Sequence, residues 1–230
     1  MEIDGEGNIG NVNGGEPLGS CLCNISDEGS TESHRYYLSR RTVLEMLKDR
    51  GYTVSASEID LSLQEFRDIH SQSPDVDRLR FSAAHLTDPS KRILVVFCGN
   101  SMVKVNVIRG IVAQIVNRDS LTGLILILQN QITNQARKAL DLLPFKVEIF
   151  QITDLLVNIT KHVLKPKHRL LTADEKERLL RKYSIEEKEL PRMSRNDAIA
   201  RYYGLEKGHV VKIIYCGGIT DSYITYRCVW

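Results

Sequence analysis

The feature that most constrains the fold is an alternation of strand-length apolar runs with helix-length amphipathic segments in the middle of the chain. Helical periodicity over about 103–118 and 133–142 separates strand-length segments that are too short for helices. Two of them are the apolar runs Ile93–Phe97 and Leu124–Leu128, and Val147 and Ile149 mark a third strand. Strands joined in this way pair in parallel through right-handed crossovers. The pattern therefore predicts an α/β domain built on a parallel sheet.

The residues before the first of these strands predict two helices and a β-hairpin. Tyr36–Arg50 carries apolar side chains on one helical face, and a glycine suited to a left-handed helix end follows it. Ser62 and Glu65 have the spacing of a capping box that begins a second helix. Residues 79–84 then alternate in polarity before a turn, which indicates a hairpin with the strand that follows.

The last third of the chain predicts a second, smaller α+β unit. It follows a basic, proline-containing stretch at 161–169. A capping box at Thr172 begins one helix, and Asn196 or Asp197 is placed to cap another. Two apolar segments with glycines between them then predict an antiparallel strand pair. These segments are Val210–Tyr215 and Tyr223–Val229.

Charge separates the N-terminal segment from the rest of the chain. Residues 1–33 carry seven acidic side chains and no Lys or Arg, whereas residues 34–230 carry 22 acidic and 31 basic side chains, a net charge of +9. The N-terminal segment has no aromatic residue, so it cannot bury enough apolar surface to offset the entropy cost of ordering. We expect a disordered acidic tail at 1–33, a first domain at 34–158 and a second domain at 159–230.

Cysteine spacing and the length of the apolar runs indicate in which cellular compartment the protein is found. Five cysteines at irregular spacing fit a reducing compartment better than a disulfide framework. No apolar run approaches the ~20 residues that a membrane span requires. The first residues do not have the pattern of a signal peptide. We therefore expect a soluble, intracellular protein with no membrane partner.

No arrangement of residues predicts catalysis. Nuclease-like folds hold Mg²⁺ with a Pro-Asp pair and carboxylates on a neighbouring strand; Pro74-Asp75 is present, but Ile93–Phe97 contains no carboxylate. The six histidines are scattered, and the chain contains no Walker A or dinucleotide-binding motif. Cys21 and Cys23 form a lone pair without a second pair at zinc spacing. We expect no catalytic residue, no metal and no cofactor; a metal-dependent nuclease that uses Asp75 is the enzyme alternative.

One polar loop is a candidate for phosphate contact. Residues 129–135 join the end of a strand to a helix that Thr133 is placed to cap. A helix N-terminus presents free N–H groups and the positive end of the helix dipole, and Arg137 and Lys138 add charge one turn later. On these residues alone an ordinary polar loop is the simpler interpretation, and phosphate contact stays open.

A set of spaced residues in the last third of the chain carries a family resemblance. They are Leu190-Pro191-Arg192, Asp197, Ala200-Arg201-Tyr202-Tyr203-Gly204-Leu205, Lys207-Gly208, Val210-Val211-Lys212-Ile213 and Tyr226-Arg227. This set resembles the assembly domain of the fifth subunit of eukaryotic nuclear DNA-directed RNA polymerases, a domain with a similar counterpart in archaeal polymerases. Further matches at Met46–Tyr52 and within 156–171 extend the resemblance over about 34–230.

The resemblance implies a non-catalytic polymerase subunit in the nucleus. Its second domain would dock on the largest polymerase subunit. Its first domain would form part of a jaw beside downstream double-stranded DNA, with a nuclease-like topology that lacks a nuclease site. The implied DNA-proximal residues are Thr133, Asn134, Gln135 and Arg137. The implied assembly residues are Pro191, Arg192, Asp197, Arg201, Tyr202, Tyr203, Lys212 and Arg227.

The residues alone leave the position of one aromatic cluster open. Arg201, Tyr202 and Tyr203 fit either an exposed anchor set or the edge of a core.

The residues also leave open which nuclear polymerase contains the chain. Shorter matches resemble the plant RNA polymerase V form, which implies noncoding transcription in small-RNA-directed DNA methylation and gene silencing. Ala198, where most family members have Pro, also suggests a specialised form. The alternative is the fifth subunit shared by RNA polymerases I, II and III. The shorter matches are Ser33–Leu38, Ser101–Asn106, Gly123–Asn130 and Arg227–Trp230.

Overall fold

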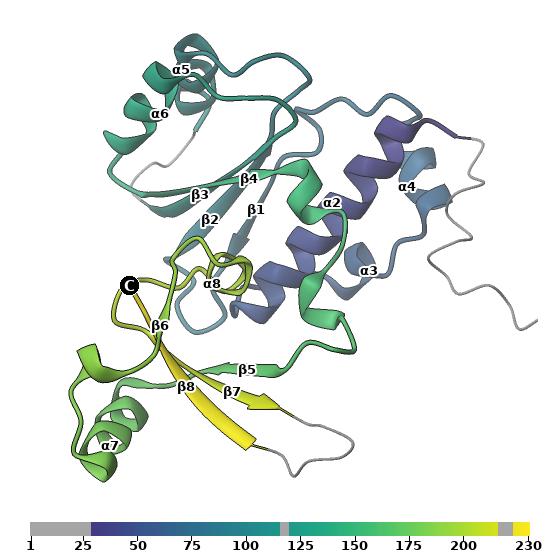
Figure 1. Cartoon of the computed structure of the whole chain (residues 1–230). Helices are drawn as coiled ribbons and strands as arrows, with labels where there is room; N and C mark the ends of the chain where they lie inside the picture. Colours follow the sequence, from purple (N-terminus) through teal and green to yellow (C-terminus); the bar gives the residue numbers. More distant parts are fainter. Residues whose placement is uncertain (1–28, 116–119, 216–222) are drawn as a thin grey trace, which may run out of the picture.

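Two four-stranded sheets form the framework of the molecule (Figure 1). The computed structural model describes residues 29–115, 120–215 and 223–230 of the 230-residue chain. All strands of the first sheet precede all strands of the second sheet in sequence. An α/β unit is thus followed by a smaller α+β unit, as the sequence predicts.

The first sheet combines one hairpin with three parallel strands. β1 (Phe81–Ala84) pairs antiparallel with β2 (Arg92–Phe97), and β2 pairs in parallel with β3 (Leu121–Leu128). β3 pairs in parallel with β4 (Lys146–Gln151), which forms one edge of the sheet. Both the predicted hairpin and the predicted parallel pairing are confirmed.

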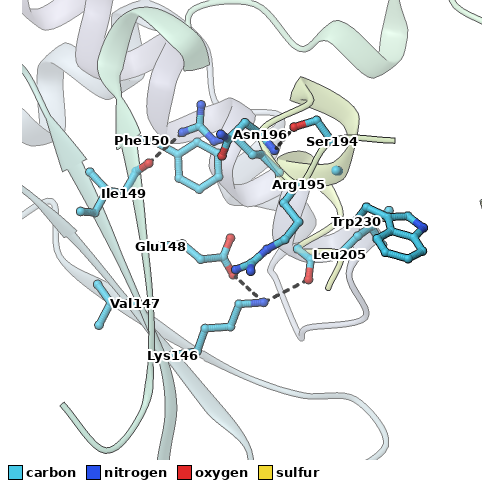
Figure 2. Close-up of a pocket in the computed structure, with 13 residues that line it drawn as sticks. Lys146, Val147, Glu148, Ile149, Phe150, Ser194, Arg195, Asn196, Leu205 and Trp230 are labelled. Carbon is cyan, nitrogen blue, oxygen red and sulfur yellow. Dashed lines mark hydrogen bonds and ion pairs between the residues drawn. The ribbon is translucent and has the colours of Figure 1, made fainter. Parts of the chain in front are cut away.

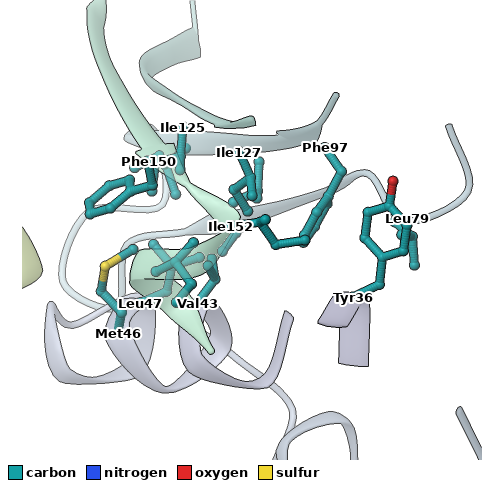
Figure 3. Packing of buried hydrophobic residues seen from close by; sticks show 14 of the residues in the cluster. Tyr36, Val43, Met46, Leu47, Leu79, Phe97, Ile125, Ile127, Phe150 and Ile152 are labelled. Carbon is teal, nitrogen blue, oxygen red and sulfur yellow. The ribbon is translucent and has the colours of Figure 1, made fainter. Parts of the chain in front are cut away.

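Helices cover both faces of this sheet, so its central strand is buried on both sides. α5 (Val105–Ala113) and α6 (Asn134–Asp141) pack on one face, against Leu124, Leu126 and Leu128. α2 (Thr31–Asp49) packs on the other face. In Figure 3, Val43, Met46 and Leu47 of α2 face Ile125, Ile127 and Phe150 of the sheet. Alternate residues of β3 therefore belong to different cores, as a pleated strand requires.

Two short helices follow α2. α3 (Ala56–Ile59) and α4 (Leu63–His70) lie beside it (Figure 1). The predicted capping box of α4 is confirmed, because Ser62 accepts from the backbone N–H of Glu65 and the Glu65 carboxylate accepts from the backbone N–H of Ser62.

Two helix boundaries differ from the prediction. α2 begins at Thr31, because the Ser30 side chain accepts from the backbone N–H of Ser33, whose own side chain is fully buried. Residues 31–33 are therefore helical and not part of a tail at 1–33; residues 1–28 lie outside the described residues. α5 begins at Val105 instead of residue 103, because Val103 forms a β-bridge with Ile132. The expected end of that helix at residue 118 lies in the undescribed segment 116–119.

The second sheet is shorter and less covered. Its strand order is β5 (Lys167–Leu170), β7 (Val210–Tyr215), β8 (Tyr223–Val229) and β6 (Arg192–Met193). The predicted antiparallel pairing of β7 with β8 is confirmed. β5 and β6 are not predicted, because each is short and defined by its partner strand more than by an apolar pattern.

Two helices accompany the second sheet. α7 (Ala173–Tyr183) begins with the predicted capping box of Thr172 and Glu175. α8 (Ala198–Tyr202) begins with Asp197, whose side chain accepts from the backbone N–H of Ile199 at 2.9 Å. Short 3-10 turns complete the connections: η3 (Ile152–Leu155), η4 (Ile159–Lys161) and η5 (Glu187–Glu189). Within the described ranges, no helix has the length and apolar character needed to cross a bilayer.

Candidate functional site

The two domains meet at a joint centred on Arg50, the C-cap residue of α2. Its guanidinium donates to both carboxylate oxygens of Glu148 on β4, at 3.0 and 2.8 Å. It also donates to the backbone carbonyls of Tyr202 and Arg201 at the end of α8, at 2.8 and 2.7 Å. One arginine thus neutralises a carboxylate of the first sheet and satisfies two terminal carbonyls of a helix in the second domain.

Gly204 is required where the chain leaves α8. Its φ of +63° lies in the left-handed region, and a Cβ there would meet the Arg50 guanidinium at 3.1 Å. A glycine at this point both ends the helix and admits the arginine to the helix carbonyls.

Arg201 forms a second connection across the joint. Its guanidinium donates to the backbone carbonyl of Ile149 at 2.7 Å and pairs with Asp154 at 3.1 Å. It also lies over the ring of Phe150, 4.6 Å from the ring centroid. The contact to Ile149 uses a carbonyl of β4, the edge strand, and so blocks part of an edge that is otherwise free to pair with another chain.

Tyr202 completes the joint with a partly buried hydrogen-bond network. Its hydroxyl donates to Asp49 at 2.8 Å and accepts from the Asn158 amide at 3.2 Å. Asn158 also donates to Glu45 at 2.7 Å, and Lys161 pairs with the same carboxylate. Burial raises the pKa of Tyr202. Burial also opposes ionisation of Glu45, but the hydrogen bonds from Asn158 and Lys161 outweigh it and hold the pKa of Glu45 below its usual value.

The joint changes the interpretation of three predicted assembly residues. Tyr202 is only 4% exposed, so its ring cannot serve as an anchor for another subunit. The Arg201 guanidinium is bonded to the Ile149 carbonyl of β4 and to Asp154. The half-buried Tyr203 packs edge-on against Tyr202, with ring centroids 5.1 Å apart. Of the two interpretations left open by the sequence, burial favours the edge of a core for Tyr202, and a role of Arg201 and Tyr203 in assembly stays a prediction. The spacing of a helix alone does not show that its aromatic face meets another domain of the same chain.

The other predicted assembly residues remain available at the surface, in three places. Arg192 and Arg227 lie together, since the Arg227 guanidinium donates to the Arg192 carbonyl at 3.4 Å, and Pro191 precedes them on the same edge. Asp197 is exposed at the start of α8, where it caps the helix. Lys212 is half-buried in the middle of β7. These residues do not form a single cluster, and their role in assembly stays a prediction.

The predicted DNA-proximal residues lie together at the N-terminus of α6. Thr133 caps the helix by accepting from the backbone N–H of Ala136 at 3.2 Å, as predicted. The side chains of Asn134, Gln135 and Arg137 are exposed beside it. Two backbone hydrogen bonds between Val103 and residues 131–133, each of 3.1 Å, fix this loop against the start of α5. This places the exposed Lys104 at the same end of the two helices.

Asp75 is the carboxylate on which the nuclease alternative depends. Asp75 accepts from the backbone N–H of Asp77 at 3.0 Å and lies 3.8 Å from Arg78, in an exposed loop. Across the described residues, no three His, Cys, Asp or Glu side chains come together as a candidate metal site. Asp75 is thus a turn residue, whose carboxylate accepts from the backbone of the same turn.

A cleft of about 420 Å³ opens between β4 and the second domain (Figure 2). Lys146 lies on its floor, where it donates to the carbonyl of Gly204 at 3.1 Å and pairs with Glu206 at 2.9 Å. Glu148 also lines the cleft, but its carboxylate is already held by Arg50. Lys146, Glu148 and Arg201, which line the cleft, are all paired within the chain, so the cleft is part of the joint.

Sequence reasoning missed most of the joint. Arg50 and Glu45 give no sign of their partners in the other part of the joint, which lie 98 or more positions away in sequence. Glu148 did offer a signal. It is a carboxylate between the two apolar residues of a predicted strand, and a charge that becomes largely buried there needs a partner, because an unpaired buried charge is too costly.

Comparison with known proteins identifies the class to which this architecture belongs. Residues 30–115 match the family model for the N-terminal domain of RNA polymerase Rpb5, and residues 157–229 match that for its C-terminal domain. The chain is 61% identical over 210 residues to DNA-directed RNA polymerase V subunit 5A of Arabidopsis thaliana, covering 91% of this chain and 95% of the relative. The chain belongs to the Rpb5 family of DNA-directed RNA polymerase subunits.

Two other relatives place the chain within that family. DNA-directed RNA polymerases IV and V subunit 5B of Arabidopsis thaliana is 59% identical, over 88% of this chain and 93% of the relative. The DNA-directed RNA polymerases I, II, and III subunit RPABC1 of Caenorhabditis briggsae is 35% identical, over 86% of this chain and 97% of the relative. The family resemblance found in the sequence is therefore confirmed, including its nearness to the plant polymerase V form.

Proposed function

We propose that this chain is a non-catalytic structural subunit of plant RNA polymerase V. The observation that carries this proposal is the difference in identity, 61% to a polymerase V subunit against 35% to a subunit of polymerases I, II and III. Polymerisation chemistry then belongs to other subunits, and this chain acts in the nucleus by bracing the largest one.

The proposal extends to the biological role of that polymerase. Its noncoding transcripts support small-RNA-directed DNA methylation and gene silencing. The alternative is that the chain is a fifth subunit shared by RNA polymerases I, II and III. Family membership is common to both, so only the identity of the partner subunits distinguishes them.

Affinity purification of the tagged full-length chain from native tissue, followed by mass spectrometry, tests this choice. Recovery of the polymerase V largest subunit without those of polymerases I, II and III is the expected result. Recovery of the largest subunits of the general polymerases would replace the proposal with the shared-subunit alternative. Recovery of no polymerase subunit would overturn both.

The first domain is proposed to form a jaw beside downstream double-stranded DNA, with the α6 N-terminus nearest the phosphates. Thr133 orders the helix end, Asn134 and Gln135 surround its free N–H groups, and Arg137 and Lys104 supply charge. Such contacts position DNA without reading its sequence. The nuclease-like topology without a nuclease site is part of the same proposal.

Asn134→Glu tests the jaw proposal without disturbing the fold, because Asn134 is exposed and acidic residues are well tolerated in the first turn of a helix. We expect the purified complex to retain downstream DNA less well while keeping its full set of subunits. Asn134→Gln is the neutral control. Unchanged DNA retention with Glu would contradict the placement of DNA at this loop, and loss of subunits would contradict the division of roles between the domains.

A further inference from the structure

Six carboxylates precede α2 in a segment whose point of attachment to the fold is fixed. Residues 1–28 contain six acidic side chains and no Lys or Arg. The chain enters the described structure at Gly29, and the backbone N–H of Ser30 donates to the Gln72 side chain at 2.9 Å. Ser30 also caps α2, so the acidic segment is attached at the N-terminal end of that helix. The six acidic residues are Glu2, Asp4, Glu6, Glu16, Asp27 and Glu28.

The N-terminal end of α2 is joined to the loops that follow β2 and β3. The hydroxyl of the buried Tyr36 accepts from the side-chain amide of Gln129, which follows β3. Asn100, which follows β2, donates to Glu32 at 3.5 Å, and its backbone carbonyl accepts from Asn130 at 3.2 Å. These two loops lead directly into α5 and α6. The acidic segment is therefore attached at the end of the first sheet where α5 and α6 begin.

Four exposed cations belong to α5 and α6. The two helices pack together and contain one acidic residue, Asp141, at the C-terminal end of α6. A β-bridge between Val103 and Ile132 holds their starts side by side. In the part of the chain that the structure describes, no ion pair involves any of the four cations. We call α5 and α6 with these side chains the basic helix pair, whose cations are Lys104, Arg109, Arg137 and Lys138.

Charge and distance favour the acidic segment as the occupant of the basic helix pair. A chain of 28 residues spans up to about 90 Å when extended, so its carboxylates can reach α5 and α6. Figure 1 shows α2 running from its purple N-terminal end to the second domain, a length of about 28 Å for its 19 residues. The cations of the second domain lie beyond that far end, and Lys161 and Arg169 there already have carboxylate partners. Covalent attachment therefore gives the carboxylates a higher effective concentration at the basic helix pair than at the second domain.

We propose that segment 1–28 docks on the basic helix pair when DNA is absent, and that downstream duplex DNA displaces it. The displacement rests on the proposed function, because Lys104 and Arg137 are the charges assigned there to DNA. Carboxylates and phosphates are attracted by the same exposed cations, so the two anions compete for them. Each exposed ion pair contributes little alone. The docked state thus needs several pairs at once, and a duplex that presents many phosphates displaces it more readily than a short DNA end does.

Carbodiimide cross-linking of the free, full-length chain tests the docking. The reagent joins a carboxylate to a lysine amine where the two are in contact, and mass spectrometry identifies the joined peptides. We expect carboxylates of segment 1–28 to be joined to Lys104 and Lys138. Lys182 is the control, because it is exposed on α7 in the second domain. No cross-link to the basic helix pair, or equal cross-linking to Lys182, would overturn the inference.

The same reaction in the purified polymerase tests the competition. We expect the cross-links from segment 1–28 to the basic helix pair to fall about tenfold when the polymerase holds duplex DNA, compared with the DNA-free enzyme. Undiminished cross-links would contradict the competition. Cross-links from segment 1–28 to another subunit in place of the basic helix pair would overturn the inference.

Neutralising the acidic segment tests the consequence for DNA. Replacing its six acidic residues by the matching amides should raise DNA retention by the polymerase about fivefold at low salt and make retention more salt-dependent. The same replacements should give a much smaller gain when combined with Lys104→Gln and Arg137→Gln, because the shared cations are then missing. Arg178→Gln with Lys182→Gln on α7 is the matched control and should leave the gain intact. An equal gain without Lys104 and Arg137 would mean that the segment repels DNA from a distance, and would overturn the docked state.

Failure of this inference is distinguishable from failure of the jaw proposal. Cross-linking of the free chain requires neither polymerase nor DNA. If the cross-links are absent but Asn134→Glu lowers DNA retention, the jaw proposal stands and the inference is overturned. If the cross-links form but Asn134→Glu leaves DNA retention unchanged, the docking is supported and the competition with DNA is contradicted.

Discussion

The two sheets of this protein differ in how completely the chain covers its own strands. In the first sheet, β3 is buried from Gly123 to Leu128, with α2 on one face and α5 and α6 on the other. In the second sheet, β5 has no buried residue, and β8 is exposed at Tyr223 but buried at Val229. The first sheet supplies its own core, whereas the second sheet is covered in part by the first domain, at the joint.

The largest expected effect lies in the core of the first sheet. Leu126→Ala should lower the free energy of unfolding by about 3 kcal/mol, because the fully buried side chain leaves a cavity between well-packed neighbours. Ile224→Ala on the exposed end of β8 should lower it by less than about 1 kcal/mol. Denaturant unfolding of the full chain measures both values. Equal losses of unfolding free energy for the two substitutions would contradict the difference in burial between the two sheets.

The next effect concerns the joint. Arg50→Ala leaves the largely buried Glu148 carboxylate without its partner and exposes two helix carbonyls, so we expect a loss of about 3 kcal/mol in unfolding free energy. Glu148→Gln is the partner substitution, and Arg50→Ala with Glu148→Gln together should cost less than the sum of the two single losses. Simple additivity in that double-mutant cycle would show that the two residues do not interact.

A smaller effect depends on pH. The pKa of Glu45 is lower in the folded protein than its ordinary value of about 4.3, so ionised Glu45 contributes stability above that pH and loses it as pH falls through the folded pKa. Glu45→Gln should therefore cost about 1 kcal/mol near pH 7 and progressively less below pH ~4. Unfolding curves of both proteins at several pH values measure this. A difference that stays constant across the acid range would exclude Glu45 as the titrating group.

The smallest expected effect is an increase in the unfolding free energy. Ala198 occupies the first position of α8, and Asp197 before it has φ −58° and ψ 137°, which a following proline accepts. No hydrogen bond of the described residues uses the Ala198 N–H. Ala198→Pro should therefore raise the unfolding free energy by about 0.4–1 kcal/mol by restricting the unfolded chain. A loss of stability would mean that α8 is more tightly constrained by the joint than its backbone geometry indicates.

The contrast between the sheets also explains what the sequence revealed. Ile93–Phe97 and Leu124–Leu128 were found because a strand buried on both faces is apolar throughout. The caps at Ser62, Thr133, Thr172 and Asp197 were found because a cap is a local signal.

What escaped the sequence depends on distant partners. β5 has no apolar pattern, because its strand character comes from pairing with β7, about forty residues later. The contacts at the joint also depend on residues that are distant in sequence. Arg201 and Tyr202 were recognised as important, but only the packed domains show that their contacts are internal. The DNA-proximal residues and the remaining assembly residues stay predictions.

Hydrogen exchange of the full chain, free and within the purified polymerase, tests the central claim most directly. The account predicts that β2, β3 and β4 exchange slowly in both states, because their cover comes from this chain. It predicts that β5 and the start of β8, which this chain leaves exposed, become protected only within the polymerase. Equal exchange of these two strands in the two states would contradict the account, as would protection in the polymerase that is confined to the first domain.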